Sequence, residues 1–315
     1  MPDFAEFLDA KFDLDERSLA RDVRDECFTR LACRDRLRCL DVGSGTGAMI
    51  RRLLDADLPA ETLELVALDR DAALLARARA SLVASLASRG FVLREIVPAP
   101  SSDRADHIEA SDGRRHVALR CTCCDVNDFE PDSGERYDLV TAHAFIDLVP
   151  MRPLLERISG WLAPDGLLYA TLNYDGETAL FPQYADAELE ERLLARYDAS
   201  MEERRIDGKP TGGARSGRRL HAMLPAVGFE VLAFASSDWN AVPHDGQLRA
   251  ADAVVVSVLL EAMRRENEAH CDPERLAAWY RDRRTLLEAG RLGAIVHQID
   301  VLAMLAPASA AYERG

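Results

Sequence analysis

The stretch Arg36–Gly47, RLRCLDVGSGTG, carries the strongest indication of the fold, because a mostly apolar run leads into a glycine-rich loop. The apolar run predicts a short buried strand. The loop's glycines are Gly43, Gly45 and Gly47. They remove side chains where a backbone must turn tightly and approach a ligand. Residues 48–54 predict a helix whose first free N–H groups face this loop. A strand, a glycine loop and a helix in this order are typical of a site for a nucleotide-like cofactor.

The same loop fits two kinds of cofactor. From Gly43 to Ala48 it satisfies the G-x-G-x-x-A dinucleotide fingerprint, and Asp69 follows at about the 20-residue distance expected of a nicotinamide site. Asp41 argues against that interpretation, because an acid directly before the loop would repel a pyrophosphate. Beside a cofactor that carries an ammonium and a sulfonium group, the same carboxylate is favourable. An NAD(P)-dependent oxidoreductase therefore stays open as the less favoured alternative.

The motif D-x-G-x-G-x-G at 41–47 resembles the first motif of class I, Rossmann-like S-adenosylmethionine (SAM)-dependent methyltransferases. The resemblance implies that this loop holds SAM, with S-adenosylhomocysteine (SAH) as the product. The implied contact residues are Asp41, Gly43, Ser44, Gly45, Thr46 and Gly47.

Two further strand ends extend this resemblance. A second predicted strand ends at Asp69, and the resemblance implies that its carboxylate accepts hydrogen bonds from both ribose hydroxyls, with Arg70 beside the adenine. A third predicted strand ends at Asp125. Its family counterpart accepts from the adenine amino group, while the next backbone N–H, that of Val126, meets a ring nitrogen. The resemblance therefore implies three acids at three strand ends around one cofactor.

We expect an α/β fold built on a doubly wound, mostly parallel sheet of seven strands. The predicted strands lie at 36–42, 63–71, 117–126, 137–145, 166–174, 229–239 and 290–305. Residues 91–116, between the second and third strands, carry turn signals that predict a hairpin-like elaboration.

The domain plan follows from where helical patterns interrupt these strands. Residues 1–35 predict an N-terminal helical cap, in which apolar side chains repeat every four residues at Leu19, Val23, Cys27 and Leu31. Residues 36–315 then form the SAM-binding domain. Helical insertions are expected after the fifth strand, at about 175–217, and after the sixth, at about 247–289. The second insertion suits either a cover over the site or the face of a homodimer.

Catalytic candidates come from the ends of the fourth and fifth strands. Methyl transfer is an in-line displacement, so the protein mainly positions the acceptor and excludes water. His143 is the first candidate for a general base, and packing against the methionine part of SAM is an equally good interpretation. Asp147 and Tyr174 are further catalytic candidates. The acceptor-binding candidates are Asn173, Tyr184, Arg215, Arg218, Arg219 and Trp239.

The insertion at 175–217 is the predicted substrate lid, because insertions at the carboxyl ends of strands lie over the ligand crevice. Between Arg204 and Arg219, six Lys or Arg residues stand against one acid, Asp207. Such a run suits an anionic group on the substrate. A solvated loop whose arginines pair with the acidic helix before it is the favoured alternative.

Composition favours a cytoplasmic enzyme that acts on a small molecule. The net charge of −15 argues against a nucleic-acid substrate, and residues 142–145, AHAF, lack the [N/D]-P-P-[Y/F] element of base-amine methyltransferases. No apolar run reaches the roughly 18–20 residues of a membrane span, and the cysteines at 121, 123 and 124 suit buried thiols better than a metal site. We expect no membrane partner and no metal. A SAM-binding regulatory protein without activity stays open.

Overall fold

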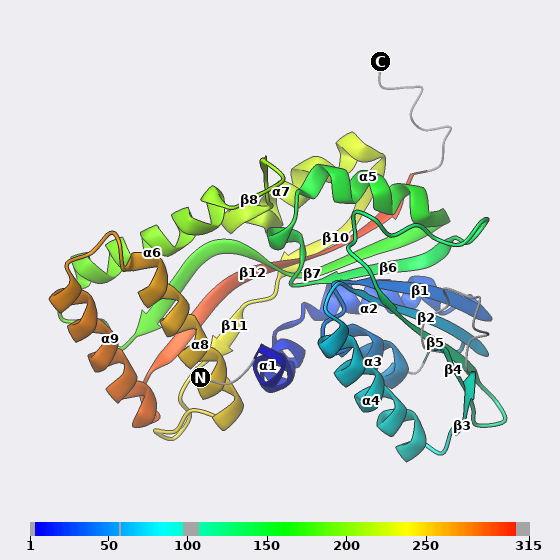
Figure 1. Ribbon diagram of the computed structural model, residues 1–315, viewed down its shortest axis with the longest axis horizontal. Helices are drawn as coiled ribbons and strands as arrows, with labels where there is room; N and C mark the ends of the chain where they lie inside the picture. Colours follow the sequence, from blue (N-terminus) through cyan, green and yellow to red (C-terminus); the bar gives the residue numbers. More distant parts are fainter. Residues whose placement is uncertain (1–3, 57, 97–106, 307–315) are drawn as a thin grey trace.

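The computed structural model describes residues 4–56, 58–96 and 107–306, in which ten strands form one sheet (Figure 1). Seven of these strands match the predicted ones: β1 (Arg36–Val42), β2 (Thr62–Asp69), β5 (His116–Cys123), β6 (Tyr137–His143), β7 (Leu162–Phe181), β10 (Phe229–Ser236) and β12 (Gly293–Leu305). Their order is β10-β12-β7-β6-β1-β2-β5. The pairs from β5 to β7 are parallel, whereas β12 pairs antiparallel with β7 on one side and with β10 on the other, so that β12 alone of these seven strands is reversed. The predicted doubly wound α/β fold is confirmed.

The predicted count of seven strands is too low. The hairpin of β3 (Val92–Ile96) and β4 (His107–Ser111) pairs antiparallel with β5 and extends the sheet at that edge, which β5 would otherwise leave unpaired. A third short strand, β11 (Trp239–Ala241), pairs with the beginning of β12. The hairpin-like elaboration was predicted, but not its pairing with the main sheet.

Helices cover both faces of the sheet (Figure 1). One face carries α2 (Arg21–Leu31), α3 (Ala48–Asp55) and α4 (Ala72–Ser88), and the other carries α5 (Met151–Trp161) and α7 (Ser216–Met223). Each face has its own apolar cluster. The predicted stripe is buried as expected, at Leu19, Val23, Cys27 and Leu31. Leu19 precedes α2, and the other three lie on the face of α2 that packs against the sheet.

β7 is much longer than the predicted fifth strand, which ended at 174. The chain passes an irregularity at 175–177, where Gly176 and Glu177 have positive φ, and then pairs with β12 again up to Phe181. In the sequence, the pair Asp175-Gly176 predicts a turn. Here it forms a bulge that bends a continuing strand. The inserted segment therefore begins after Phe181.

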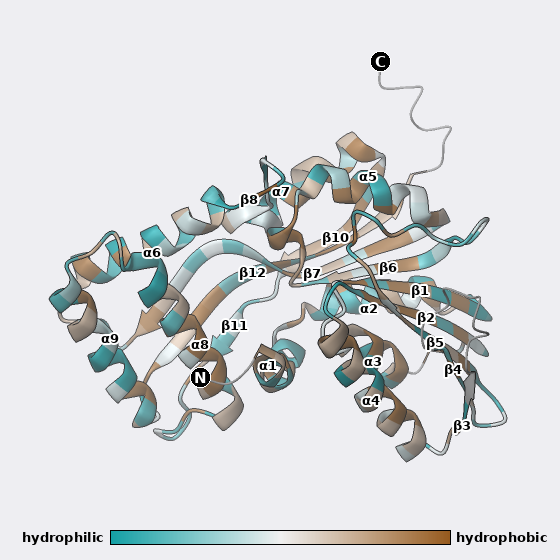
Figure 2. Cartoon of the chain, viewed as in Figure 1, coloured by the Kyte–Doolittle hydropathy of each residue, from teal (hydrophilic) through white to brown (hydrophobic). Residues whose placement is uncertain are grey.

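The far ends of β7 and β12 carry a group of three helices that we name the helical lobe. It consists of α6 (Ala187–Glu203), α8 (Ala250–Asn267) and α9 (Pro273–Glu288), which lie within the two segments where helical insertions were expected. A third apolar cluster fills its interior, while hydrophilic residues mark much of its outer surface (Figure 2). Glu190 of α6 and Arg283 of α9 form a buried ion pair there, and the indole N–H of Trp279 donates to the same carboxylate. No described helix combines the length and apolarity needed to cross a membrane.

The helical region at the amino end divides into two parts. α2 belongs to the sheet, as described above. α1 (Phe4–Ser18) lies between the sheet and the helical lobe, where it packs against α8 and β11. Its position brings it to the carboxyl ends of the central strands.

Candidate functional site

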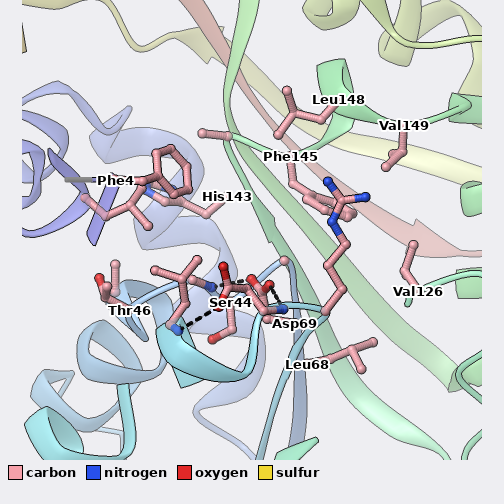
Figure 3. Close-up of a pocket in the computed structure, with 18 of the residues that line it drawn as sticks. Phe4, Ser44, Thr46, Leu68, Asp69, Val126, His143, Phe145, Leu148 and Val149 are labelled. Carbon is pink, nitrogen blue, oxygen red and sulfur yellow. Dashed lines mark hydrogen bonds between the residues drawn. The ribbon is translucent and has the colours of Figure 1, made fainter. Parts of the chain in front are cut away.

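A cavity of about 580 Å³ opens at the carboxyl ends of β1, β2, β5 and β6, under α1. Its volume lies within the range of roughly 300–1,000 Å³ that small-molecule sites occupy. Polar loops after β1, β2 and β5 line one side, and Figure 3 shows Ser44 and Asp69 there. The opposite side is apolar, with Leu148 and Val149 labelled. In parallel α/β sheets, ligands bind at this end of the strands where the winding reverses.

Asp69 lies against the glycine loop. Its Oδ2 accepts a hydrogen bond from the backbone N–H of Gly45 at 2.8 Å, and its Oδ1 accepts from that of Asp71 at 2.9 Å. A loop amide that would hold a phosphate in a dinucleotide site therefore meets a carboxylate. Ser44, Thr46 and Arg70 also line the cavity.

Asp41 does not line the cavity. It is buried, and its two oxygens accept hydrogen bonds from the hydroxyls of Ser44, at 2.6 Å, and Thr141, at 2.7 Å. Burial raises the pKa of Asp41 to about 6, against the lowering effect of these two hydrogen bonds. Asp41 therefore shapes the loop from behind.

The glycines act through close packing. A Cβ at Gly43, whose φ is +66°, would collide with the ring of Phe145, which itself lines the cavity. At Gly47, which precedes α3 with φ +83°, a Cβ would lie 3.2 Å from side-chain atoms of Ala78 and Leu82 on α4. Gly47 thus serves helix packing and does not line the cavity, whereas Gly43 and Gly45 do.

Asp125 and Val126 also line the cavity, at the end of β5. Asp125 forms a turn in which its Oδ1 accepts from both the backbone and the side-chain nitrogen of Asn127, each at 2.9 Å. Its other carboxylate oxygen, Oδ2, accepts no hydrogen bond from the described part of the chain. The three strand-end loops that the sequence singled out therefore meet around one cavity.

His143 lines the cavity but has a partner at each ring nitrogen. Nε2 lies 3.0 Å from Oδ2 of Asp15, and Nδ1 lies 2.7 Å from the hydroxyl of Thr171. Because a carboxylate only accepts, Nε2 carries the proton and Nδ1 accepts from Thr171. Burial, with the charges of Arg52 and Lys11, lowers the pKa of His143 to about 3. The imidazole is neutral at pH 7, and its lone pair is engaged.

Asp15 joins α1 to this network. Its Oδ2 also accepts from Nζ of Lys11 at 2.6 Å, and its Oδ1 accepts from the indole N–H of Trp239 at 2.9 Å. Burial acts to raise the pKa of Asp15, but Lys11 and the hydrogen bond from His143 outweigh it and hold that pKa well below its usual range. Trp239, an acceptor-binding candidate from the sequence, is thereby brought to the cavity.

Three other candidates lie outside the cavity lining. Tyr174 points into the helical lobe, where its hydroxyl contacts Asp198 at 2.6 Å. Asn173 is buried on β7 and donates to the carbonyl of Ile299. Asp147 follows β6 in a short 3₁₀ turn, and burial raises its pKa. None of the three faces the space in which the loops and α1 meet.

The three arginines predicted to bind the acceptor do not line the cavity, and two of them are paired with acids. Arg218 binds Asp175 at 2.7 Å, and Arg219 binds Glu202 of α6 at 2.8 Å. Arg215 packs over Gly176. The pair of Arg219 with Glu202 matches the alternative in which the arginines pair with the acidic helix before the loop, whereas Asp175 lies on β7. Tyr184 lies in the helical lobe beside Arg283, and the inserted segment reaches the cavity through Ile206.

The lining contributed by α1 was missed by sequence reasoning. One stripe of this helix faces the cavity, with Phe4, Phe7, Leu8 and Lys11. Its spacing of three and four residues was a readable helical signal. The sequence could not predict the surface against which this stripe packs, because α1 and the glycine loop lie far apart along the chain.

No protein-family model and no curated protein matches the chain. Several solved structures do match it in fold. A candidate methyltransferase of Bacillus halodurans C-125 is 15% identical with a TM-score of 0.50, covering 91% of this chain and all of that one. The YcgJ protein of Bacillus subtilis has 14% identity and a TM-score of 0.48, with 91% and 99% covered. A candidate sarcosine dimethylglycine methyltransferase of Galdieria sulphuraria has 14% identity and a TM-score of 0.43, and the match covers 91% of this chain and 84% of that one. With its strand order and its loop geometry, the chain has the fold of the class I, Rossmann-like SAM-dependent methyltransferases.

Proposed function

We propose that this protein is a SAM-dependent methyltransferase that acts on a small-molecule acceptor. The observation that carries the proposal is the charge of the cavity's polar side. Three acids, Asp69, Asp71 and Asp125, line it against one arginine, Arg70. A cofactor with a sulfonium and an ammonium group suits such a lining, whereas a pyrophosphate would meet like charge. This favours SAM over NAD(P).

The residues present fit SAM in detail. In this proposal Asp69 accepts from the ribose diol and Asp125 accepts from the adenine amino group; the support is that both line the cavity and that Oδ1 of Asp125 takes the hydrogen bonds from Asn127. Gly43 and Gly45 expose backbone without a side chain on the loop that lines the cavity. When bound, SAM supplies an electrophilic methyl group. The chain's own contribution is to hold the acceptor in line with that methyl, under α1 and away from water.

A general base is not part of the proposal. Both nitrogens of His143 are engaged, so we assign this residue to anchoring α1 and walling the cavity. Asp147 and Tyr174 lie outside the lining. The proposed mechanism is therefore positioning alone. The cofactor contacts that we retain as proposals are Gly43, Ser44, Gly45, Thr46, Asp69, Arg70, Asp125 and Val126, with Asp41 and Gly47 as supports of the loop.

A thermal-shift titration with SAM, SAH, NAD and NADP in parallel tests the proposal. A ligand at 100 times its dissociation constant adds about 2.7 kcal/mol to stability, which gives a readily measured shift. We expect SAM and SAH to stabilise the protein and the nicotinamide nucleotides to have no effect. Stabilisation by NAD or NADP instead would refute the cofactor assignment.

Asp69→Asn sharpens this test. The substitution removes the charge that a ribose diol would meet, so we expect SAH affinity to fall by about 10- to 100-fold. The matched control is Asp128→Asn, which changes an exposed acid outside the cavity and should leave SAH affinity unchanged. Isothermal titration calorimetry measures both. Equal affinities for the Asp69 variant and the wild type would remove Asp69 from the cofactor site.

A further inference from the structure

Lys11 places a buried ammonium group in the part of the cavity wall that α1 and Trp239 form. We name this part the acceptor side. Its side chain is 8% exposed, and its Nζ has one partner among the described residues, Oδ2 of Asp15 at 2.6 Å. An ammonium has three N–H donors, so two are left for a ligand. The surrounding walls are aromatic and aliphatic, with Phe4, Phe7 and Trp239. Nζ lies 5.7 Å from the centre of the Trp239 ring.

The position is chemically distinctive within this chain. The chain has 39 Lys and Arg residues, of which two are lysines, Lys11 and Lys209. Lysine offers a compact point charge, whereas the planar guanidinium needs more room and a bidentate partner. Asp15 fixes the direction of the ammonium, since its carboxylate is itself held by His143 and Trp239. The cation is therefore both buried and oriented.

The acceptor side offers no free base among the described residues. His143 has both nitrogens engaged. The carboxylates that line the cavity, Asp69, Asp71 and Asp125, belong to the polar side. An acceptor bound beside Lys11 must therefore reach the site already deprotonated.

We propose that the acceptor is a small carboxylate with an apolar body, held by Lys11 and methylated to its ester. The inference rests on the proposed function. A carboxylate has two oxygens, so one accepts from Nζ while the other attacks. The attacking oxygen forms the new O–CH₃ bond as the methyl–sulfur bond breaks. The bond pair stays on sulfur, giving ester and SAH, and no proton is transferred. An anion and a sulfonium become two neutral groups, which an apolar cavity favours.

Other acceptors fit this side of the cavity less well. A phenol, with a pKa near 10, and an alkylamine, near 10.4, both carry a proton at pH 7 that a base must remove. A protonated amine would also be repelled by Lys11. A carboxylic acid, with a pKa near 4, is ionised without help. Because the acceptor side has a cation and no free base, it favours a carboxylate over a phenol or an amine as the acceptor.

The test uses two matched sets of probes on the SAH-saturated protein. One set is phenylacetate, 2-phenylethanol and phenethylamine, and the other is octanoate, octan-1-ol and octylamine. Calorimetry should show the carboxylate of each set binding at least tenfold more tightly than its alcohol and amine. With SAM, gas chromatography should detect the methyl esters. Failure of both carboxylates to bind, or tighter binding of an alcohol or an amine, would overturn the assignment.

Lys11→Met isolates the ammonium. We expect it to weaken carboxylate binding at least tenfold while alcohol binding and SAH affinity stay within about threefold of wild type. Asp15 keeps its bonds from His143 and Trp239 in this variant, and SAH affinity reports that the site has folded. Lys209→Met makes the same chemical change at the exposed lysine and should alter nothing. Carboxylate selectivity that survives in Lys11→Met would refute the role of Lys11. Loss of SAM and SAH binding by the wild type would instead refute the proposed function itself.

Discussion

His143 shows how the site keeps a titratable group neutral. It is surrounded by Lys11 of α1, Arg52 of α3 and the Asp15 carboxylate, with Nη1 of Arg52 3.3 Å from its Nε2. Burial and the two cations disfavour a second proton, while Asp15 favours it, and the net result is a pKa of about 3. Protonation would add a third cation to this buried group, so the folded protein resists it.

This environment predicts a pH effect on stability. The unfolded chain takes up a proton on His143 below about pH 6.5, whereas the folded protein does so only near pH 3. The unfolded state therefore binds more protons between these values, and stability falls as the pH drops. From pH 7.5 to 5 the contribution of His143 is a loss of about 2 kcal/mol. In His143→Asn this loss should disappear.

Urea unfolding of the wild type and of His143→Asn at both pH values measures the difference. Asp41 and Asp300, each with a pKa raised to about 6 by burial, titrate in the same window and contribute equally to both proteins. The comparison between the two proteins therefore isolates His143. Parallel pH dependences would contradict the prediction.

Among individual residues, the sequence predicted the cavity-lining side chains that follow strands, but it did not predict those that come from α1. Asp69 and Asp125 were predictable because the carboxyl ends of parallel strands meet at one edge of the sheet. Asp15 was not, because its partners His143 and Trp239 lie more than 100 residues away along the chain. Lys11 was not either, because its place in the site depends on its ion pair with Asp15. A role for Asp41 against the ligand was inferred from its charge and from the family resemblance. Its two hydroxyl partners are visible only in the folded protein.

The glycine loop is the element whose geometry is most constrained. Gly43 has φ +66° and packs against Phe145, whereas Gly90, after α4, has φ +84° and open space around its Cα. Alanine at either position is strained by about 1–2 kcal/mol. Gly43→Ala additionally forces a methyl group against an aromatic ring, which costs about 1–3 kcal/mol more. We therefore expect Gly43→Ala to be the more destabilising variant by that difference.

Urea unfolding of the two alanine variants provides the comparison. Gly90→Ala is the matched control, because it shares the backbone strain but not the collision. SAH affinity should fall in Gly43→Ala and stay unchanged in Gly90→Ala, since Gly43 lines the cavity and Gly90 does not. Equal losses of stability in both variants would show that Phe145 moves aside at no cost.

The sequence predicted which segments are helices and which are strands, but it did not predict how far a strand continues. The helical insertion expected at about 247–289 contains α8 and α9. The extension of β7 beyond its bulge escaped prediction, because Asp175-Gly176 has the local chemistry of a turn. Pairing with β12 beyond the bulge makes it a strand again. The arginines of the inserted segment were equally ambiguous, since only the fold reveals Asp175 and Glu202 as their partners.

At the scale of the molecule, two strands join the sheet to the helical lobe. β7 and β12 pair from Leu167 with Met304 near one end to Phe181 with Gly293 at the other, so they cross both the central sheet and the lobe. α1 adds a second connection, because it closes the cavity and packs on α8. These shared elements argue that the lobe and the sheet unfold together.

The three tryptophans make this argument testable, since Trp161 lies in the sheet's apolar cluster and Trp279 in that of the lobe. A variant that keeps Trp161 alone and one that keeps Trp279 alone, with phenylalanine at the other positions, each report one region. Within each variant, fluorescence and far-UV circular dichroism should give superimposable urea transitions. SAH at 100 times its dissociation constant should then shift both transitions by about 2.7 kcal/mol, although Trp279 does not line the cavity. If SAH moved the Trp161 transition and left the Trp279 transition in place, the lobe would be an independent folding unit, and the continuity of β7 and β12 would not transmit stability between them.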